Sequence, residues 1–161
     1  MTYANRTEVA PERSRAEIEK TLRRYGASSF AYGWSGDVAS IQFDANERRV
    51  RIMLPMPSPE DPEFTLTPTG KRRAKDAAAK AHDQAVRSRW RALLLIVKAK
   101  LEAVESGVTT FEEEFLPHIV LPSGDTVGQW AIPQVAHSYE TGEMPEILPG
   151  VRPAIEATSP T

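Results

Sequence analysis

Few residues of this chain have the types and spacing that catalysis or metal binding requires. There is no cysteine, and only three histidines occur, at positions 82, 118 and 137. Glu114 and His118 are four residues apart, but Pro117 between them interrupts the helical face that they would need to share. No HExxH motif, nucleophile elbow, P-loop or GxGxxG pattern is present. We therefore expect a non-enzymatic protein with no cofactor and no metal site.

Positive charge is concentrated in one part of the chain. Residues 71–100 contain ten basic and two acidic residues, a net charge of +8, although the whole chain has a net charge of −2. Residues 101–161 contain one basic and ten acidic residues, a net charge of −9. Segregated positive charge attracts an anionic partner, and the phosphate backbone of DNA or RNA is the most common one.

The basic residues that are candidates for phosphate contacts lie on, or just before, one predicted helix. These nucleic-acid-binding candidates are Lys71, Arg72, Arg73, Lys75, Lys80, Arg87, Arg91 and Lys98. On an ideal helix, the last four fall on one line. Contacts of this kind give salt-sensitive binding that is largely independent of base sequence. The alternative is that the acidic C-terminal part neutralises the helix, and that the chain is a protein–protein interaction module or associates with itself.

Three aromatic residues on one predicted strand allow two interpretations. Phe30, Tyr32 and Trp34 alternate with small residues, so their side chains share one face of the strand. Such a ladder can stack bases, as in nucleic-acid-binding sheets, or it can pack beneath a helix. Apolar ladders on half-buried strands usually belong to the core, so packing is the favoured interpretation. Arg49 and Arg51, on the opposite face of a later strand, either extend a phosphate-binding surface or are simply solvated.

One long helix is expected to position these residues. It is predicted over 76–106 and ends at Gly107, because its apolar residues follow a 3.6-residue period without an intervening proline. Its stripe comprises Val86, Trp90, Leu93, Leu94, Val97, Leu101 and Val104. A first helix is predicted from Ser14 as N-cap, with Glu17 completing a capping box, to Gly26. Alternation of apolar and polar residues then predicts antiparallel strands around 30–34, 39–43 and 50–54.

The remaining segments are predicted to be loops and short helices. Residues 55–70 contain five prolines and predict an extended loop with a possible short strand at 64–67. After Gly107, Thr109 or Thr110 is expected to cap a short helix through Phe111 and Phe115. A last helix is predicted from Thr126 to about Tyr139, with a kink at Pro133 and its end at Gly142. Its inner face is assigned to Val127, Trp130 and Ala131.

These elements predict a single α+β domain over 13–142: an N-terminal helix, a three-stranded antiparallel sheet, a long helix packed on the sheet and a small helical C-terminal cover. Residues 1–12 are expected to be flexible, 55–75 to form a Pro-rich and then basic loop, and 143–161 to form an extended tail. The N-terminus has no apolar signal region, and the longest apolar run, 92–97, is far shorter than the 20 or so residues that span a bilayer. We expect a cytoplasmic protein with no membrane partner.

Several stretches resemble known families. Residues 17–27, 89–107, 110–116 and 121–127 resemble a family of uncharacterised bacteriophage and prophage proteins, which implies a phage-type accessory protein and no particular mechanism. The run Gly70–Lys80 resembles the start of the last helix of double-stranded-RNA-binding domains, where basic side chains and helix N-terminal amides meet phosphates. The predicted α-β-β-β-α order is shared with those domains and, in topology alone, with single-strand annealing proteins.

Overall fold

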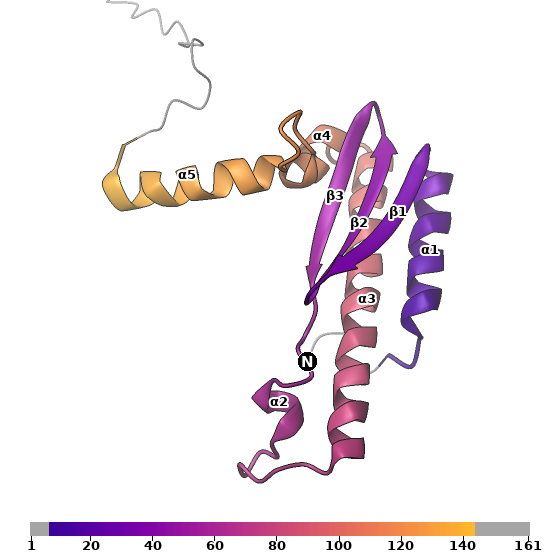
Figure 1. Cartoon of the computed structure of the whole chain (residues 1–161). Coiled ribbons are helices and arrows are strands. Elements are labelled where there is room, and N and C mark those ends of the chain that lie inside the picture. Colours follow the sequence, from indigo (N-terminus) through magenta and orange to yellow (C-terminus); the bar gives the residue numbers. More distant parts are fainter. Residues whose placement is uncertain (1–6, 144–161) are drawn as a thin grey trace, which may run out of the picture.

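The structure of the chain is a computed structural model that describes residues 7–143, and it is an α+β fold (Figure 1). In chain order the elements are α1 (Pro11–Arg24), β1 (Ser29–Ser35), β2 (Val38–Ala45), β3 (Arg48–Pro55), α2 (Pro62–Thr65), α3 (Lys75–Glu105), α4 (Phe111–Phe115), η2 (Leu116–His118) and α5 (Val127–Thr141). The predicted fold class is therefore confirmed. The expected flexible N-terminus and C-terminal tail fall outside the described residues, except for 7–12 and 143.

The three strands form an antiparallel sheet in the order β1-β2-β3. Two-residue turns join them, and the Asn46-Glu47 turn has positive φ at both residues, as a tight hairpin turn requires. Ile41 of β2 lies opposite Ile52 of β3, and Phe43 lies opposite Val50. All four side chains are buried, so one face of the sheet is apolar, as the period-two alternation predicted.

Helices α1 and α3 cover this apolar face side by side (Figure 1). The two helices run in the same direction, as two contacts between them show. Glu17, in the middle of α1, pairs with Arg91, and Tyr25, just after α1, donates from its Oη to Oε2 of Glu102, later in α3, at 3.2 Å. The largest fully buried side chains of the two helices and the sheet form one core: Ile18, Leu22, Ile41, Phe43, Val50, Leu93, Leu94 and Val97.

The long helix is confirmed almost residue for residue. Helix α3 ends at Glu105, and Gly107 adopts the left-handed conformation at φ 75° that ends a helix. Its buried residues run from Trp90 to Leu101, so the sheet and α1 cover only its second half. The first half extends past the ends of the strands and contacts the short helix α2 (Figure 1). This extension carries much of the basic segment away from the core.

The prediction for the start of the first helix was wrong. Helix α1 begins at Pro11 with Ala10 as N-cap, because a proline is preorganised for the first helical position. Ser14 therefore lies within the helix, where its side chain is buried. Glu17, three residues later, does not form the expected capping box. Its carboxylate instead pairs with Arg91 and Lys98 of α3.

The prediction of a short strand at 64–67 was also wrong. Pro62 starts the short helix α2, which buries Phe64 against α3, and a single bridge pairs Leu66 with Arg72. The expected cap on the following short helix is confirmed at Thr110. Its hydroxyl accepts from the Glu113 amide, and the Glu113 side chain accepts from the Thr110 amide, which completes a capping box.

The last helix does not cover the domain as predicted. Helix α5 is capped by Thr126, continues through Pro133 and ends at Gly142, but it extends away from the sheet (Figure 1). Only Gly128 of its residues is buried. Trp130, which was assigned to the inner face, is 41% exposed. The predicted C-terminal cover is therefore supplied by α4 and η2 alone.

Candidate nucleic-acid interface

The basic run before α3 is held by a tight turn. The backbone amide of Lys71 donates to Thr67 Oγ1 at 3.0 Å, and Gly70 adopts a positive φ of 79° in the turn. Arg73 Nε donates to the carbonyl oxygen of Leu66 at 2.8 Å, which ties the run back onto its own loop. These contacts hold the backbone and leave the side chains of Lys71 and Arg72 exposed.

Six of the eight predicted phosphate-contacting residues form no ion pair with any acidic residue within 7–143, and one of the six, Arg73, is held by the carbonyl oxygen of Leu66. The other five, called the free basic set below, are Lys71, Arg72, Lys75, Lys80 and Arg87. They lie on the loop leading into α3 and on its first half. Since no described carboxylate neutralises them, their charge is available to an anionic partner.

The other two predicted residues on α3, Arg91 and Lys98, are paired with α1. The carboxylate of Glu17 contacts Arg91 Nη1 at 3.6 Å and also binds Lys98 Nζ. The hydrogen bond from Lys98 is the main reason why the pKa of Glu17 is lowered from its ordinary value. Sequence reasoning placed both cations on one line with Lys80, but it could not identify this partner, which is more than seventy residues away in the chain.

The acidic C-terminal part neutralises little of the helix within the described residues. Lys100 Nζ pairs with Glu114 of α4 at 3.0 Å, and this is the contact that the neutralisation hypothesis expected. Glu113 instead completes the cap of α4. Across residues 7–143, no carboxylate C-terminal to α3 pairs with the free basic set.

Arg49 and Arg51 do not extend the basic surface of α3. They alternate with the buried Val50, so they lie on the face of the sheet opposite the two long helices. Arg49 pairs with Asp44 at 2.9 Å, and Arg51 donates to the carbonyl oxygen of Gly124 at 2.6 Å. These two residues therefore lie on the other face of the sheet from α3.

The aromatic ladder divides between the core and the surface. Phe30 packs against the core, but Tyr32 is 48% exposed and Trp34 is 77% exposed. Packing beneath the long helix, the favoured interpretation, is therefore wrong for Trp34, whereas the half-exposed Tyr32 places its ring edge-on to Trp90 of α3 at 6.4 Å. The reason is that β1 is an edge strand, and the part of β1 that carries Trp34 lies beside α3 near Val86, where α1 does not cover it.

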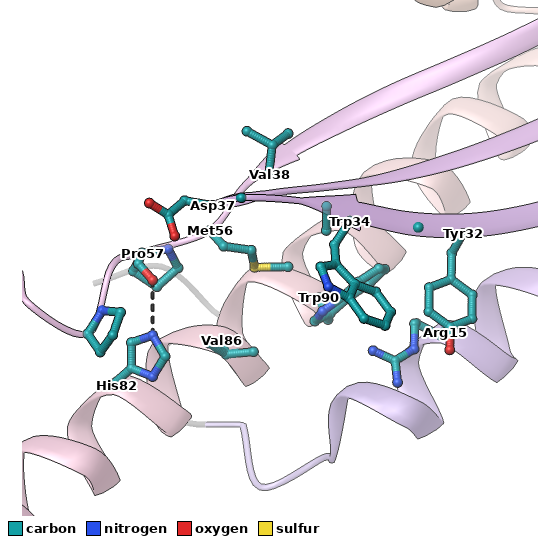
Figure 2. Close-up of a pocket in the computed structure, with 14 residues that line it drawn as sticks. Arg15, Tyr32, Trp34, Asp37, Val38, Met56, Pro57, His82, Val86 and Trp90 are labelled. Carbon is teal, nitrogen blue, oxygen red and sulfur yellow. Dashed lines mark hydrogen bonds between the residues drawn. The ribbon is translucent and has the colours of Figure 1, made fainter.

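Tyr32 and Trp34 line a cleft of about 280 Å³, called the aromatic cleft below (Figure 2). Trp90 of α3 forms part of its lining and is only 3% exposed. Arg15 enters from α1, with its guanidinium carbon 4.7 Å from the ring centre of Tyr32 and 5.1 Å from that of Trp90. These are cation–π distances, so the arginine is fixed between two rings with its charge in the cleft.

The opposite wall of the aromatic cleft comes from the loop after β3. His82 Nε2 donates to the carbonyl oxygen of Pro57 at 2.9 Å (Figure 2). The ring of Phe64 packs edge-on against the His82 ring at 5.4 Å. The amide of Met56 donates to the carbonyl oxygen of Asp37 at 2.7 Å. The Pro-rich loop is thereby attached to both α3 and the first hairpin, and the cleft has defined walls.

The described residues contain no group of three or more histidine, aspartate or glutamate side chains that could hold a metal ion. His118 is half-buried in η2, and burial, together with the charge of Lys100, lowers its pKa. No helix within 7–143 combines the length and the hydrophobicity that crossing a bilayer would take.

Comparison with family models, with curated proteins and with solved structures gave no match to this chain. The resemblances to phage proteins and to double-stranded-RNA-binding domains therefore stay predictions.

Proposed function

We propose that this chain is a non-enzymatic accessory protein that binds the phosphate backbone of DNA or RNA, largely independently of base sequence. The observation that supports the proposal is the free basic set, whose five cations have no carboxylate partner in the described part of the chain. Positive side chains left exposed and unpaired on one segment are the usual feature of a phosphate-binding surface.

The N-terminus of α3 adds to this surface. Its N-cap is Ala74, and no side chain caps the first helical amides. Unsatisfied N–H groups at a helix N-terminus favour anions, and here Lys71, Arg72 and Lys75 surround them in sequence. Both features act on any phosphate group, which explains why the proposal does not include base-specific recognition.

The proposal predicts a definite salt dependence. Five phosphate contacts give a slope of log K against log salt of about −3.5 for a single strand and about −4.5 for a duplex. Fluorescence anisotropy with labelled oligonucleotides across a salt series measures this slope. The triple variant Lys71→Gln/Arg72→Gln/Lys75→Gln should reduce the slope for a single strand to about −1.4, because two cations of the set remain.

A matched control removes the same charge elsewhere. Arg13 and Lys20 on α1, and Arg48 at the start of β3, are exposed basic residues. Their replacement by glutamine lowers the net charge equally and should leave the slope close to that of the unmodified protein. If both triple variants lose the same affinity, or if no oligonucleotide binds at low salt, the proposal is wrong.

A second candidate function, self-association, rests on α5. This helix projects from the body and leaves apolar side chains exposed, and large exposed apolar residues in one segment indicate a protein contact. They are Trp130, Ile132, Val135 and Tyr139. Light scattering across a concentration series tests this function: the protein should dimerise, and Ile132→Asp/Tyr139→Asp should abolish the dimer. A protein that stays monomeric at every concentration contradicts it.

A further inference from the structure

We propose that the aromatic cleft is a stacking site for an unpaired base, so that the preferred ligand is single-stranded nucleic acid. This inference rests on the function proposed above and gives it a substrate class. It concerns different residues, however, so the two can be tested separately.

The exposure of two large rings side by side on one strand is the first observation. Tyr32 and Trp34 lie two residues apart on β1, and Figure 2 shows Trp34 beside Trp90 of α3 and Tyr32 over Arg15 of α1. Trp34 leaves 77% of its surface exposed, whereas Phe30 on the same face of β1 is partly buried against the core. A ring that is held at a cleft with its face free offers a surface on which any base can stack.

The second observation is the planar guanidinium at the aromatic cleft. The guanidinium of Arg15 lies against the rings of Tyr32 and Trp90 and forms an ion pair with Glu12 at 3.0 Å. Because Glu12 offsets its charge, Arg15 supplies the cleft with a planar group rather than a free cation, and guanidinium planes, like aromatic rings, stack on bases.

The size of the aromatic cleft is consistent with one base. Its volume of about 280 Å³ is at the lower limit of small-molecule pockets, which typically measure about 300–1,000 Å³. The carboxylate of Asp37 and the ring of His82 line the same cleft, and they supply polar groups at the edge of an apolar floor. That combination suits a flat ring with polar edges better than an extended apolar ligand.

The aromatic cleft borders the half of α3 that carries Lys75, Lys80 and Arg87. His82 and Val86 line the cleft, and Lys75 is seven residues before His82 on the same helix. Seven residues make two turns, a rise of about 10 Å, so Lys75 and His82 lie on the same side of α3. A strand with one base in the cleft can therefore place its next phosphates beside the basic residues. A duplex cannot do this without unpairing, because its bases are stacked inside.

The test compares an oligothymidine with a duplex of equal length by fluorescence anisotropy across a salt series. Trp34→Ala should weaken binding of the single strand by about 5- to 150-fold, the range that one stacked base supplies. Binding of the duplex and both salt slopes should be unchanged, because no charge is removed. Trp34→Phe should restore most of the affinity, since it retains a ring. Since Trp34 is mostly exposed, the thermal midpoint of Trp34→Ala should equal that of the unmodified protein.

Val108→Ala is the control, because Val108 is an apolar residue that is 81% exposed and lies outside the aromatic cleft. If Trp34→Ala binds the single strand as tightly as Val108→Ala does, while Lys71→Gln/Arg72→Gln/Lys75→Gln weakens it, the stacking site is refuted and the proposed function stands. Tighter binding of the duplex by the unmodified protein also refutes the stacking site. If neither oligonucleotide binds at any salt concentration, both proposals fail.

Discussion

Replacing Glu17 by glutamine should increase the charge that the protein presents to nucleic acid. Glu17 of α1 is the carboxylate partner of both Arg91 and Lys98, and its side chain is 35% exposed. Glutamine keeps the size of the side chain and removes its charge. The variant therefore frees two cations that lie on the same helix as the free basic set.

The size of the effect follows from the number of cations released. Each additional phosphate contact adds about 0.7 to the steepness of the salt dependence for a single strand, so two contacts add up to about 1.4. The cost in stability is small, because partly exposed ion pairs contribute about 0–1 kcal/mol each. For a chain of this size, a loss of 1 kcal/mol lowers the thermal midpoint by about 2–4 °C.

The same substitution has a pH signature. Because the hydrogen bond from Lys98 lowers the pKa of Glu17 in the folded state, the ion pairs stabilise the protein fully above the ordinary glutamate pKa of 4.5. This contribution is lost as the pH falls through the lowered pKa of the folded state. Glu17→Gln should remove that part of the acid sensitivity, which urea midpoints between pH 7 and pH 3 will measure.

Glu19→Gln is the control for net charge. Glu19 lies on the same helix and pairs only with Arg23 among the described residues, at 2.8 Å. Anisotropy titrations at several salt concentrations should show a steeper slope for Glu17→Gln and an unchanged slope for Glu19→Gln. If both variants shift the slope equally, net charge alone is the cause. If Glu17→Gln leaves the slope unchanged, Arg91 and Lys98 do not reach phosphate, and the reasoning is refuted.

Three further predictions concern stability. Glu47→Gly should raise the thermal midpoint, because Glu47 adopts φ 59° and this left-handed conformation costs about 1–2 kcal/mol for a residue with a side chain; a lower midpoint would contradict this. His118, whose pKa is lowered by burial and by Lys100, should make the protein less stable as the pH falls below the ordinary 6.5, and urea midpoints of His118→Gln should lack that decline. Gly128→Ala should destabilise by about 1–3 kcal/mol in urea unfolding, because the new Cβ would lie 2.7 Å from the backbone oxygen of Pro117; an unchanged midpoint would show that α5 shifts without cost.

Much of the fold could be predicted from the sequence because its signals are local. The apolar period identified α3, and Gly107 and Gly142 marked two helix ends, since each adopts a backbone conformation that glycine adopts easily. The Thr110 cap could be predicted because its partner, Glu113, is three residues away. Where the local signals competed, the prediction failed: Pro11 started α1 and placed Ser14 inside the helix.

The basic candidates show where sequence reasoning about the site stops. The charge of residues 71–100 and the position of the basic line on α3 follow from composition and helix geometry. Which cations are free does not, because pairing depends on which helix lies alongside. Arg91 and Lys98 face Glu17 only because α1 packs parallel to α3.

The sequence alone determined the elements, the apolar faces and the segregation of charge, because these depend on residues close together in the chain. Tertiary structure decided the exposure of Trp34, the neutralisation of two predicted cations and the projection of α5. Each of these depends on where one element ends relative to another that is distant in the chain. Alternation places Tyr32 and Trp34 on the inner face of β1, but only the position of α1 leaves that face open at Trp34. The aromatic cleft is therefore a product of packing, formed from side chains whose types the sequence shows and whose proximity it does not.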